Sequence, residues 1–221
     1  MSNPGNQTSV YKLNGMKISS FCFIIFLSAA CGAQNKRVAD TVVGGGCEAC
    51  DLIYKGMPGA MYWETTLTSA NEPGEPMIIS GVIYQKDGKT PASDVILYVY
   101  HTDKGGLYSP GTSENSSTRH GHIRGWMKTN SQGRYQFRTI RPGAYPQRDA
   151  PQHIHPLIKE PGYSVYWIDE ILFDDDPLLT EKEKNKQQKH GGSGIIHLTK
   201  NAKGEWTGKR DIILGMNIPG Y

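Results

Sequence analysis

Several motifs that mark large classes of enzymes are absent from this chain of 221 residues. It has no GxGxxG and no P-loop, which excludes the usual glycine-rich cradles for dinucleotides and nucleotide phosphates. It also has no GxSxG, the nucleophile turn of α/β-hydrolases, and no internal repeat. The formal net charge is only +3 and no basic run occurs, so the composition predicts no nucleic-acid partner.

Helical patterning is almost absent as well. Only residues 179–189, LTEKEKNKQQK, look helical, and because nearly all of them are polar we expect a solvated excursion there. The 26 glycines, 13 prolines and 12 tyrosines are instead typical of many turns and short strands. The strand-like segments are 77–84, 94–102, 122–129, 134–140, 153–159, 164–173, 194–200 and 207–214. They predict an all-β fold, an antiparallel β-sandwich of about eight strands with long loops and little helix.

Two turns between these segments predict hairpins. NSQG joins residues 122–129 to 134–140, and NAKGEW leads into the last segment.

Residues 94–102, DVILYVYHT, carry apolar or aromatic side chains at both alternating sets of positions, so we expect this strand to be covered on both faces.

The N-terminal part of the chain resembles an export signal. In MKISSFCFIIFLSAAC, Lys17 follows Met16, and an apolar run too short to span a bilayer comfortably ends in small residues. We therefore expect residues 1–33 to be an export signal whose true start is Met16. LSAAC is similar to a bacterial lipobox except for Ser28, so lipidation at Cys31, simple cleavage near Ala33 and retention of the segment as an anchor all stay open. Each of these routes predicts an exported protein, periplasmic or on the outer surface, and lipidation would attach it to the membrane only through Cys31.

Cys47 and Cys50 in CEAC could form a metal half-site, a redox pair or a disulfide. Outside the cytoplasm disulfides persist, no second cysteine pair completes a zinc site, and no βαβ pattern surrounds the motif, so we expect a local disulfide. The expected organisation is then a polar tether over 34–46, a lead-in over 47–75 and a β-sandwich domain over 76–221.

The HIH motif of residues 153–155 is a candidate half of a metal site. On a strand, His153 and His155 point to the same face about 6–7 Å apart, where two imidazoles can share an ion. A second HxH pair, His120 and His122, shows how weak such a pair is alone. More telling is the turn PGAYP just before HIH, which presents Tyr145.

The ordered series GHIRGWMKTNSQGRYQFRTIRPGAYP, then HIH, resembles the intradiol ring-cleavage dioxygenases, the family of protocatechuate 3,4-dioxygenase and catechol 1,2-dioxygenase. The resemblance covers roughly residues 77–215 and includes the loop tyrosine of GGLYSP, Tyr108. It implies non-haem Fe(III) held by Tyr108, Tyr145, His153 and His155, and it gives the other histidine pair no ligand role.

The residue types suit that chemistry. A ferric ion is hard and favours anionic oxygen, and it holds as phenolate a tyrosine whose pKa would otherwise be near 10. The resemblance further implies that Tyr145 leaves the metal and acts as a base. The substrate would be a small aromatic diol, which O2 cleaves between its two hydroxylated carbons to give a muconate-type diacid.

Two positions depart from the family pattern RPAHIHF and TTQxYF. Ala150 stands where the family has a substrate-stabilising arginine, and Arg148 could reach the same space or lie on the surface. Glu170 stands where the family has glutamine, and a carboxylate there would repel a dianionic substrate. An alternative to the enzyme therefore stays open, a cell-surface β-sandwich binding module without the oxygen chemistry. The sequence says nothing about oligomeric state.

Overall fold

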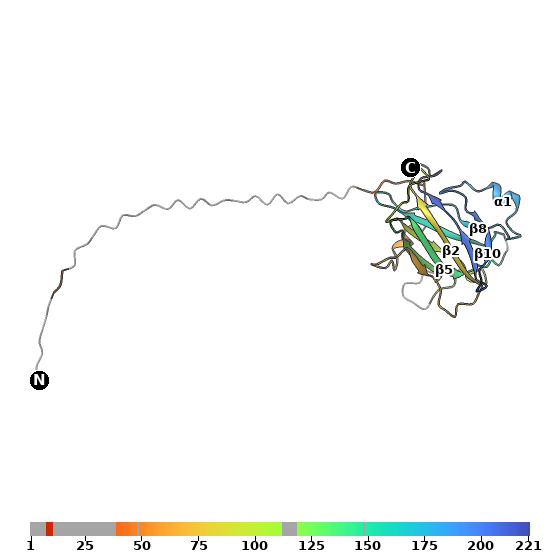
Figure 1. The fold of residues 1–221 in the computed structure, drawn as a ribbon, viewed down its shortest axis with the longest axis horizontal. Coiled ribbons are helices and arrows are strands. Elements are labelled where there is room, and N and C mark those ends of the chain that lie inside the picture. The colour runs from red at the N-terminus through yellow and green to blue at the C-terminus, as the bar shows by residue number, and fades with distance from the viewer. Residues whose placement is uncertain (1–7, 11–38, 48, 112–118, 148) are drawn as a thin grey trace, which may run out of the picture. The chain divides into compact units, whose positions relative to one another are not determined.

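Two β-sheets face each other in the part of the chain that the structure describes (Figure 1). This computed structural model describes residues 8–10, 39–47, 49–111, 119–147 and 149–221. One compact unit spans Val38–Tyr221. Most of the predicted export signal, with Met16 and Cys31, lies outside the described residues, as do residues 34–38 of the tether and Arg148.

The first sheet has the strand order β1-β5-β2-β11-β10, with β12 also paired to β2. Figure 1 shows β2 and β5 side by side within the folded part of the chain. Its strands are β1 Glu64–Thr66, β2 Pro76–Tyr84, β5 Arg134–Ile140, β10 Leu198–Lys200, β11 Trp206–Lys209 and β12 Ile212–Ile213.

The second sheet has the order β4-β3-β6-β8-β9, with β7 paired to β6. Because β3 lies between β4 and β6, it is a central strand, and β6 brings the HIH motif next to it. Its strands are β3 Ile96–Tyr100, β4 Arg124–Lys128, β6 His153–Lys159, β7 Tyr166–Trp167, β8 Ile171–Phe173 and β9 Ile195–Ile196.

The core fills the space between the sheets. Alternate residues of β2, such as Ile79, are buried in one cluster with Leu97 and Val99 of β3. The opposite face of β3 is covered too, because Tyr98 packs under Ile53 of the 3₁₀-helix η1 (Cys50–Tyr54). This confirms the prediction of a strand buried on both faces.

The predicted all-β sandwich is confirmed, with twelve strands among the described residues instead of about eight. Three predicted segments are each split into two strands, and β1 is additional. The split in 164–173 falls at Asp169, whose carboxylate accepts the backbone N–H groups of Lys189 and His190 and so draws the chain away from the ladder. The sheets are mixed, since β1, β8, β11 and β12 each make a parallel pair.

One predicted hairpin is wrong. β4 and β5 are consecutive, yet β4 pairs with β3 in one sheet and β5 pairs with β1 and β2 in the other. The NSQG turn still forms, because the Asn130 side chain accepts the backbone N–H groups of Gln132 and Arg134. Gly133 (φ 66°) has no room for a side chain, since the Ile83 carbonyl lies against it. The turn therefore carries the chain between sheets. The second predicted hairpin, β10–β11, is confirmed.

The polar segment 179–189 contains the short helix α1, Glu181–Asn185, near β8 (Figure 1). Thr180 caps it by accepting the backbone N–H of Glu183, and none of its residues is buried, which confirms the solvated excursion. Across the described ranges, no helix has the length and apolar character that a membrane crossing requires.

Residues ahead of the predicted domain also pack into the same unit. Val43 is buried in the core between the sheets. Cys47 is joined to Cys50 by a disulfide with a Cα–Cα distance of 5.5 Å, and this bridge stands at the start of η1. The expected boundaries at residues 46 and 75 stay predictions.

Candidate metal centre

Four side chains from three places in the chain converge at one end of the second sheet. The Tyr108 and Tyr145 hydroxyls are 3.0 Å apart. The Tyr145 hydroxyl is 3.1 Å from His153 Nε2, and the Tyr108 hydroxyl is 2.9 Å from His155 Nε2. These are the four residues that the family resemblance predicted as metal ligands, and the fold brings all of them together.

Strand β6 positions the two histidines. His153 and His155 are two residues apart, and their rings lie 4.6 Å apart, nearly perpendicular to each other. His153 Nδ1 is 2.6 Å from the carbonyl of Pro151, which can only accept, so Nδ1 carries the proton. The lone pair of His153 is therefore on Nε2, the atom directed at the tyrosine hydroxyls.

The loop after β3 presents Tyr108, and Asp103 shapes it. The Asp103 carboxylate accepts the Gly105 N–H at 2.8 Å, the Leu107 N–H at 3.2 Å and the Ser109 hydroxyl at 2.5 Å. Despite partial burial, these hydrogen bonds hold the pKa of Asp103 below its ordinary value. An ionised Asp103 thus fixes the turn that ends at Tyr108.

This loop is locked to the loop that carries Tyr145. The Gly143 N–H donates to the Asp103 carbonyl at 2.9 Å, and the Thr102 hydroxyl donates to the Gly143 carbonyl at 2.8 Å. Gly106 (φ 79°) lies so close to the Ala144 carbonyl that a Cβ would overlap it. Glycine is thus required where the two loops touch, and their contact sets the spacing of the two tyrosines.

His101 is a supporting residue that the sequence interpretation missed. It is buried at the end of β3, where Nε2 meets the Thr139 hydroxyl at 2.6 Å and Nδ1 meets the Thr102 carbonyl at 2.7 Å. Burial lowers the pKa of His101 to about 4, so the ring is neutral at pH 7. It ties β3 to β5 beneath the two loops. The sequence did contain one indication of this supporting role, because a polar residue directly follows a strand that was predicted to be covered on both faces.

The other HxH pair supports the centre from outside. His120 stacks on Tyr100 with ring centroids 3.6 Å apart, and Tyr100 in turn stacks on His155 at 4.7 Å. His122 contacts the Ser109 carbonyl at 2.9 Å and Glu72 at 3.0 Å, so it clamps the Tyr108 loop to the NEPGEP turn. That neither histidine is a metal ligand stays a prediction.

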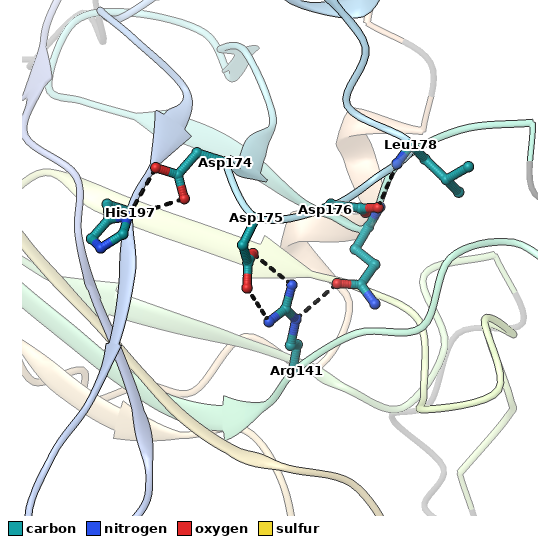
Figure 2. A network of polar contacts seen from close by, with 7 residues as sticks. Arg141, Asp174, Asp175, Asp176, Leu178 and His197 are labelled. Atoms are coloured by element: carbon teal, nitrogen blue, oxygen red, sulfur yellow. Dashed lines mark hydrogen bonds and ion pairs between the residues drawn. The ribbon is translucent and has the colours of Figure 1, made fainter.

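A polar network beside β6 fixes the approach to His153 (Figure 2). Arg141 makes a bidentate ion pair with Asp175 at 2.7 and 2.8 Å and donates to the Gln152 side chain at 2.8 Å. Asp176 accepts the backbone N–H of Gln152 at 2.6 Å and that of Leu178 at 2.9 Å. Figure 2 also shows the neighbouring His197–Asp174 contact. The network holds the residue just before HIH from two sides.

Replacing Arg141 with methionine should lower the free energy of unfolding by about 1 kcal/mol, since the lost pair is bidentate but Asp175 is 39% exposed. Hydrogen bonding to Arg141 lowers the pKa of Asp175, so the pair's contribution is complete at neutral pH and is lost as pH falls below about 4. Urea unfolding at pH 7 and pH 3 measures both effects. Arg138→Met, which removes an exposed pair with Glu205, is the control and should change stability far less. Equal effects of the two variants would contradict the role of the network.

A cleft with a volume of about 300 Å³ opens onto three of the four donor residues. Tyr145, His153 and His155 line it. Ala150 and Glu170, the two departures from the family pattern, line it as well. Glu170 Oε1 lies 3.8 Å from His155 Nδ1, which is too long for a hydrogen bond.

The donor set fits a hard metal ion. Bonds of about 2 Å to nitrogen and oxygen put neighbouring ligand atoms about 3 Å apart, and the three donor contacts here measure 2.9, 3.0 and 3.1 Å. Burial and the Tyr145 hydroxyl raise the pKa of Tyr108, so only a strong positive charge would hold it as phenolate at neutral pH. In the described residues no group of three or more His, Cys, Asp or Glu offers a rival site.

Curated relatives with matching sequences are ring-cleavage dioxygenases. The chain is 27% identical over 113 residues to the protocatechuate 3,4-dioxygenase beta chain of Burkholderia cepacia, covering 48% of each. It is 27% identical over 129 residues to catechol 1,2-dioxygenase 2 of Acinetobacter lwoffii, covering 51% of this chain and 45% of that one. The chain thus spans about half the length of the curated relatives it matches.

Solved structures agree on the fold. The dioxygenase domain of a dioxygenase and carbohydrate-binding protein fusion from Streptomyces sp. SirexAA-E superposes with a TM-score of 0.53 at 25% identity, covering 72% of this chain and 91% of that one. Catechol 1,2-dioxygenase from Pseudomonas arvilla C-1 gives 0.51 at 22% identity, covering 71% and 58%. The sequence profile described as Dioxygenase matches residues 59–191, which is more than half of the chain. On this match the chain belongs to the intradiol dioxygenase family.

Proposed function

We propose that this protein is a non-haem Fe(III) dioxygenase that cleaves a catechol-type ring between its two hydroxylated carbons with O2. The convergence of two phenols and two imidazoles, three of which line one cleft, carries the proposal. The cleft of about 300 Å³ is large enough for a single aromatic ring, since a cavity of about 150 Å³ already holds benzene.

The chain itself supplies the ligands. Tyr108, Tyr145, His153 and His155 would hold the ion, which when bound supplies Lewis acidity and favours the reaction of an electron-rich diol with O2. The Pro151 carbonyl fixes the tautomer of His153 so that Nε2 faces the centre. The stack of Tyr100 on His155 restricts the rotation of that ring.

The two tyrosines have different surroundings, which supports different roles. Tyr145 lines the cleft, whereas Tyr108 lies outside the residues that line it, next to Tyr100 on the loop held by Gly106. A substrate entering the cleft therefore meets the Tyr145 oxygen first. As a metal-held phenolate, Tyr145 would accept a proton from a substrate hydroxyl, while Tyr108 would stay in position.

We also propose that the mature protein is exported and lipid-anchored at Cys31, on the strength of the segment MKISSFCFIIFLSAAC. The mass of the mature N-terminal peptide tests this, because an unmodified residue 31 or an intact leader would rule out the anchor.

Oxygen uptake with a panel of catechols tests the proposed reaction. Iron-loaded protein should show a visible ferric-phenolate absorbance, consume one O2 per catechol and release a muconate-type diacid. The matched control is the same preparation after the iron is removed by a chelator, which should be colourless and inactive. A coloured protein that consumes no O2 with any catechol would instead support the binding-module alternative.

A further inference from the structure

A second cleft adjoins the metal-side cleft, and Glu183 of α1 together with the residues just after this helix forms part of its wall. Its volume is about 310 Å³. The two clefts share Glu170, Glu183 and Gln187, so a substituent on a ring at the metal centre could enter the outer cleft directly. The residues that line the outer cleft are Trp167, Asp169, Glu170, Glu183, Lys186, Gln187 and Gln188.

Among the described lining residues of the two clefts, carboxylates outnumber cations. Asp169 is buried and binds backbone N–H groups, which leaves Glu170 and Glu183 to meet a ligand. Glu170 is 44% exposed, and its ion-pair contact within the described chain is the long one to His155. Glu183 pairs with Lys186 at 2.7 Å, but Lys186 is 58% exposed, so solvent screens that pair. The shared wall of the clefts is therefore net negative.

An aromatic residue stands in the same wall. Trp167 of β7 lines the outer cleft and is held by an edge contact with His190, with ring centroids 4.6 Å apart. An indole next to carboxylates suits an ammonium group, because the ring attracts cations and each carboxylate accepts charge-assisted hydrogen bonds. The tryptophan is an observation independent of the acidic residues and points to the same kind of ligand.

From this wall we infer that the substrate is a catechol whose ring carries a cationic substituent, such as an aminoalkyl arm, with the ammonium in the outer cleft between Trp167, Glu170 and Glu183. The inference rests on the proposed function and adds a substrate class to it. A carboxylate on the same arm would face Glu170 and Glu183. The described cation of this wall, Lys186, is exposed and already paired with Glu183, and Ala150 offers no positive charge. Both departures from the family pattern, Ala150 and Glu170, thus favour a cationic substituent over an anionic one.

Three catechols with matched arms test the inference. They are 4-(2-aminoethyl)catechol, 4-ethylcatechol and 3-(3,4-dihydroxyphenyl)propanoate, titrated without oxygen into the iron-loaded protein by calorimetry, so that binding is measured without turnover. We expect the amine to bind about tenfold tighter than the neutral analogue and the carboxylate to bind weakest. Raising the salt concentration should reduce the differences in affinity among the three catechols, because salt screens the charges.

Charge-removing variants assign the preference to residues. Glu170→Gln and Glu183→Gln should each reduce the ratio of amine to neutral affinity about threefold, and the double variant should abolish it. Glu181→Gln is the matched control, because Glu181 is on the same helix but 82% exposed and paired with Lys184. Thermal unfolding of each variant checks that the fold is kept.

The outcomes separate the two proposals. If the amine and the neutral catechol bind equally, the inference is overturned while the proposed function stands. If the carboxylate binds tightest and Arg148→Ala removes that preference, Arg148 sets the specificity and the inference is also overturned. If none of the three binds, both proposals fail.

Discussion

His153→Ala and His155→Ala are each expected to lose most of the bound iron. Each change removes one of four protein donors that meet within 2.9–3.1 Å contacts, and a site open to substrate has no spare ligand to replace it. Affinity should fall by at least about tenfold, the lower end of what loss of even a supporting contact costs. Iron per chain, measured by metal analysis after extensive dialysis, gives the result directly.

The other histidine pair provides the matched controls. His120→Ala and His122→Ala should retain far more iron than the HIH variants, because the contacts of His120 with Tyr100 and of His122 with Ser109 and Glu72 reach the centre only through other residues. Loss of iron in these two variants, with retention in the HIH variants, would show that the ligand assignment is wrong. Absence of iron in all four and in the unmutated chain would favour the binding module.

Tyr145→Phe is expected to bleach most of the visible colour and to reduce turnover by at least about a hundredfold, the lower range for loss of a positioned general base. The change removes an anionic ligand and the proposed base together. Folding should be unaffected, because the ring remains and, among the described residues, the hydroxyl bonds to the other donor residues of the centre, Tyr108 and His153. Absorbance, oxygen uptake and thermal unfolding of the same preparation measure the three effects.

Tyr62→Phe is the control for that variant, because Tyr62 is 72% exposed and lies outside the cleft residues. It should keep the colour and the turnover of the unmutated protein. An unchanged spectrum and iron content in Tyr145→Phe would remove Tyr145 from the ligand set, whatever happened to turnover.

The sequence alone determined the local features of this protein. Period-two alternation predicted the strands and the doubly covered strand over Ile96–Tyr100, because side-chain direction on a strand depends only on position. The same rule put His153 and His155 on one face, and the motif order from GHIRG to HIH identified the family. These inferences need only neighbours in sequence.

The tertiary structure decided which distant segments meet. Alternation defines the faces of β4 and β5 but not their partners, so the expected hairpin became a crossover between sheets. The spacing of Tyr108 and Tyr145 depends on the contact between Gly106 and Ala144, which are far apart in sequence. Likewise, α1 reads as a solvated helix, and only the packing of the chain around β8 brings Glu183 to the cleft beside Glu170. Many strand and loop pairings compete during folding, and the most stable one decides these long-range contacts. A local sequence pattern does not show which pairing is the most stable.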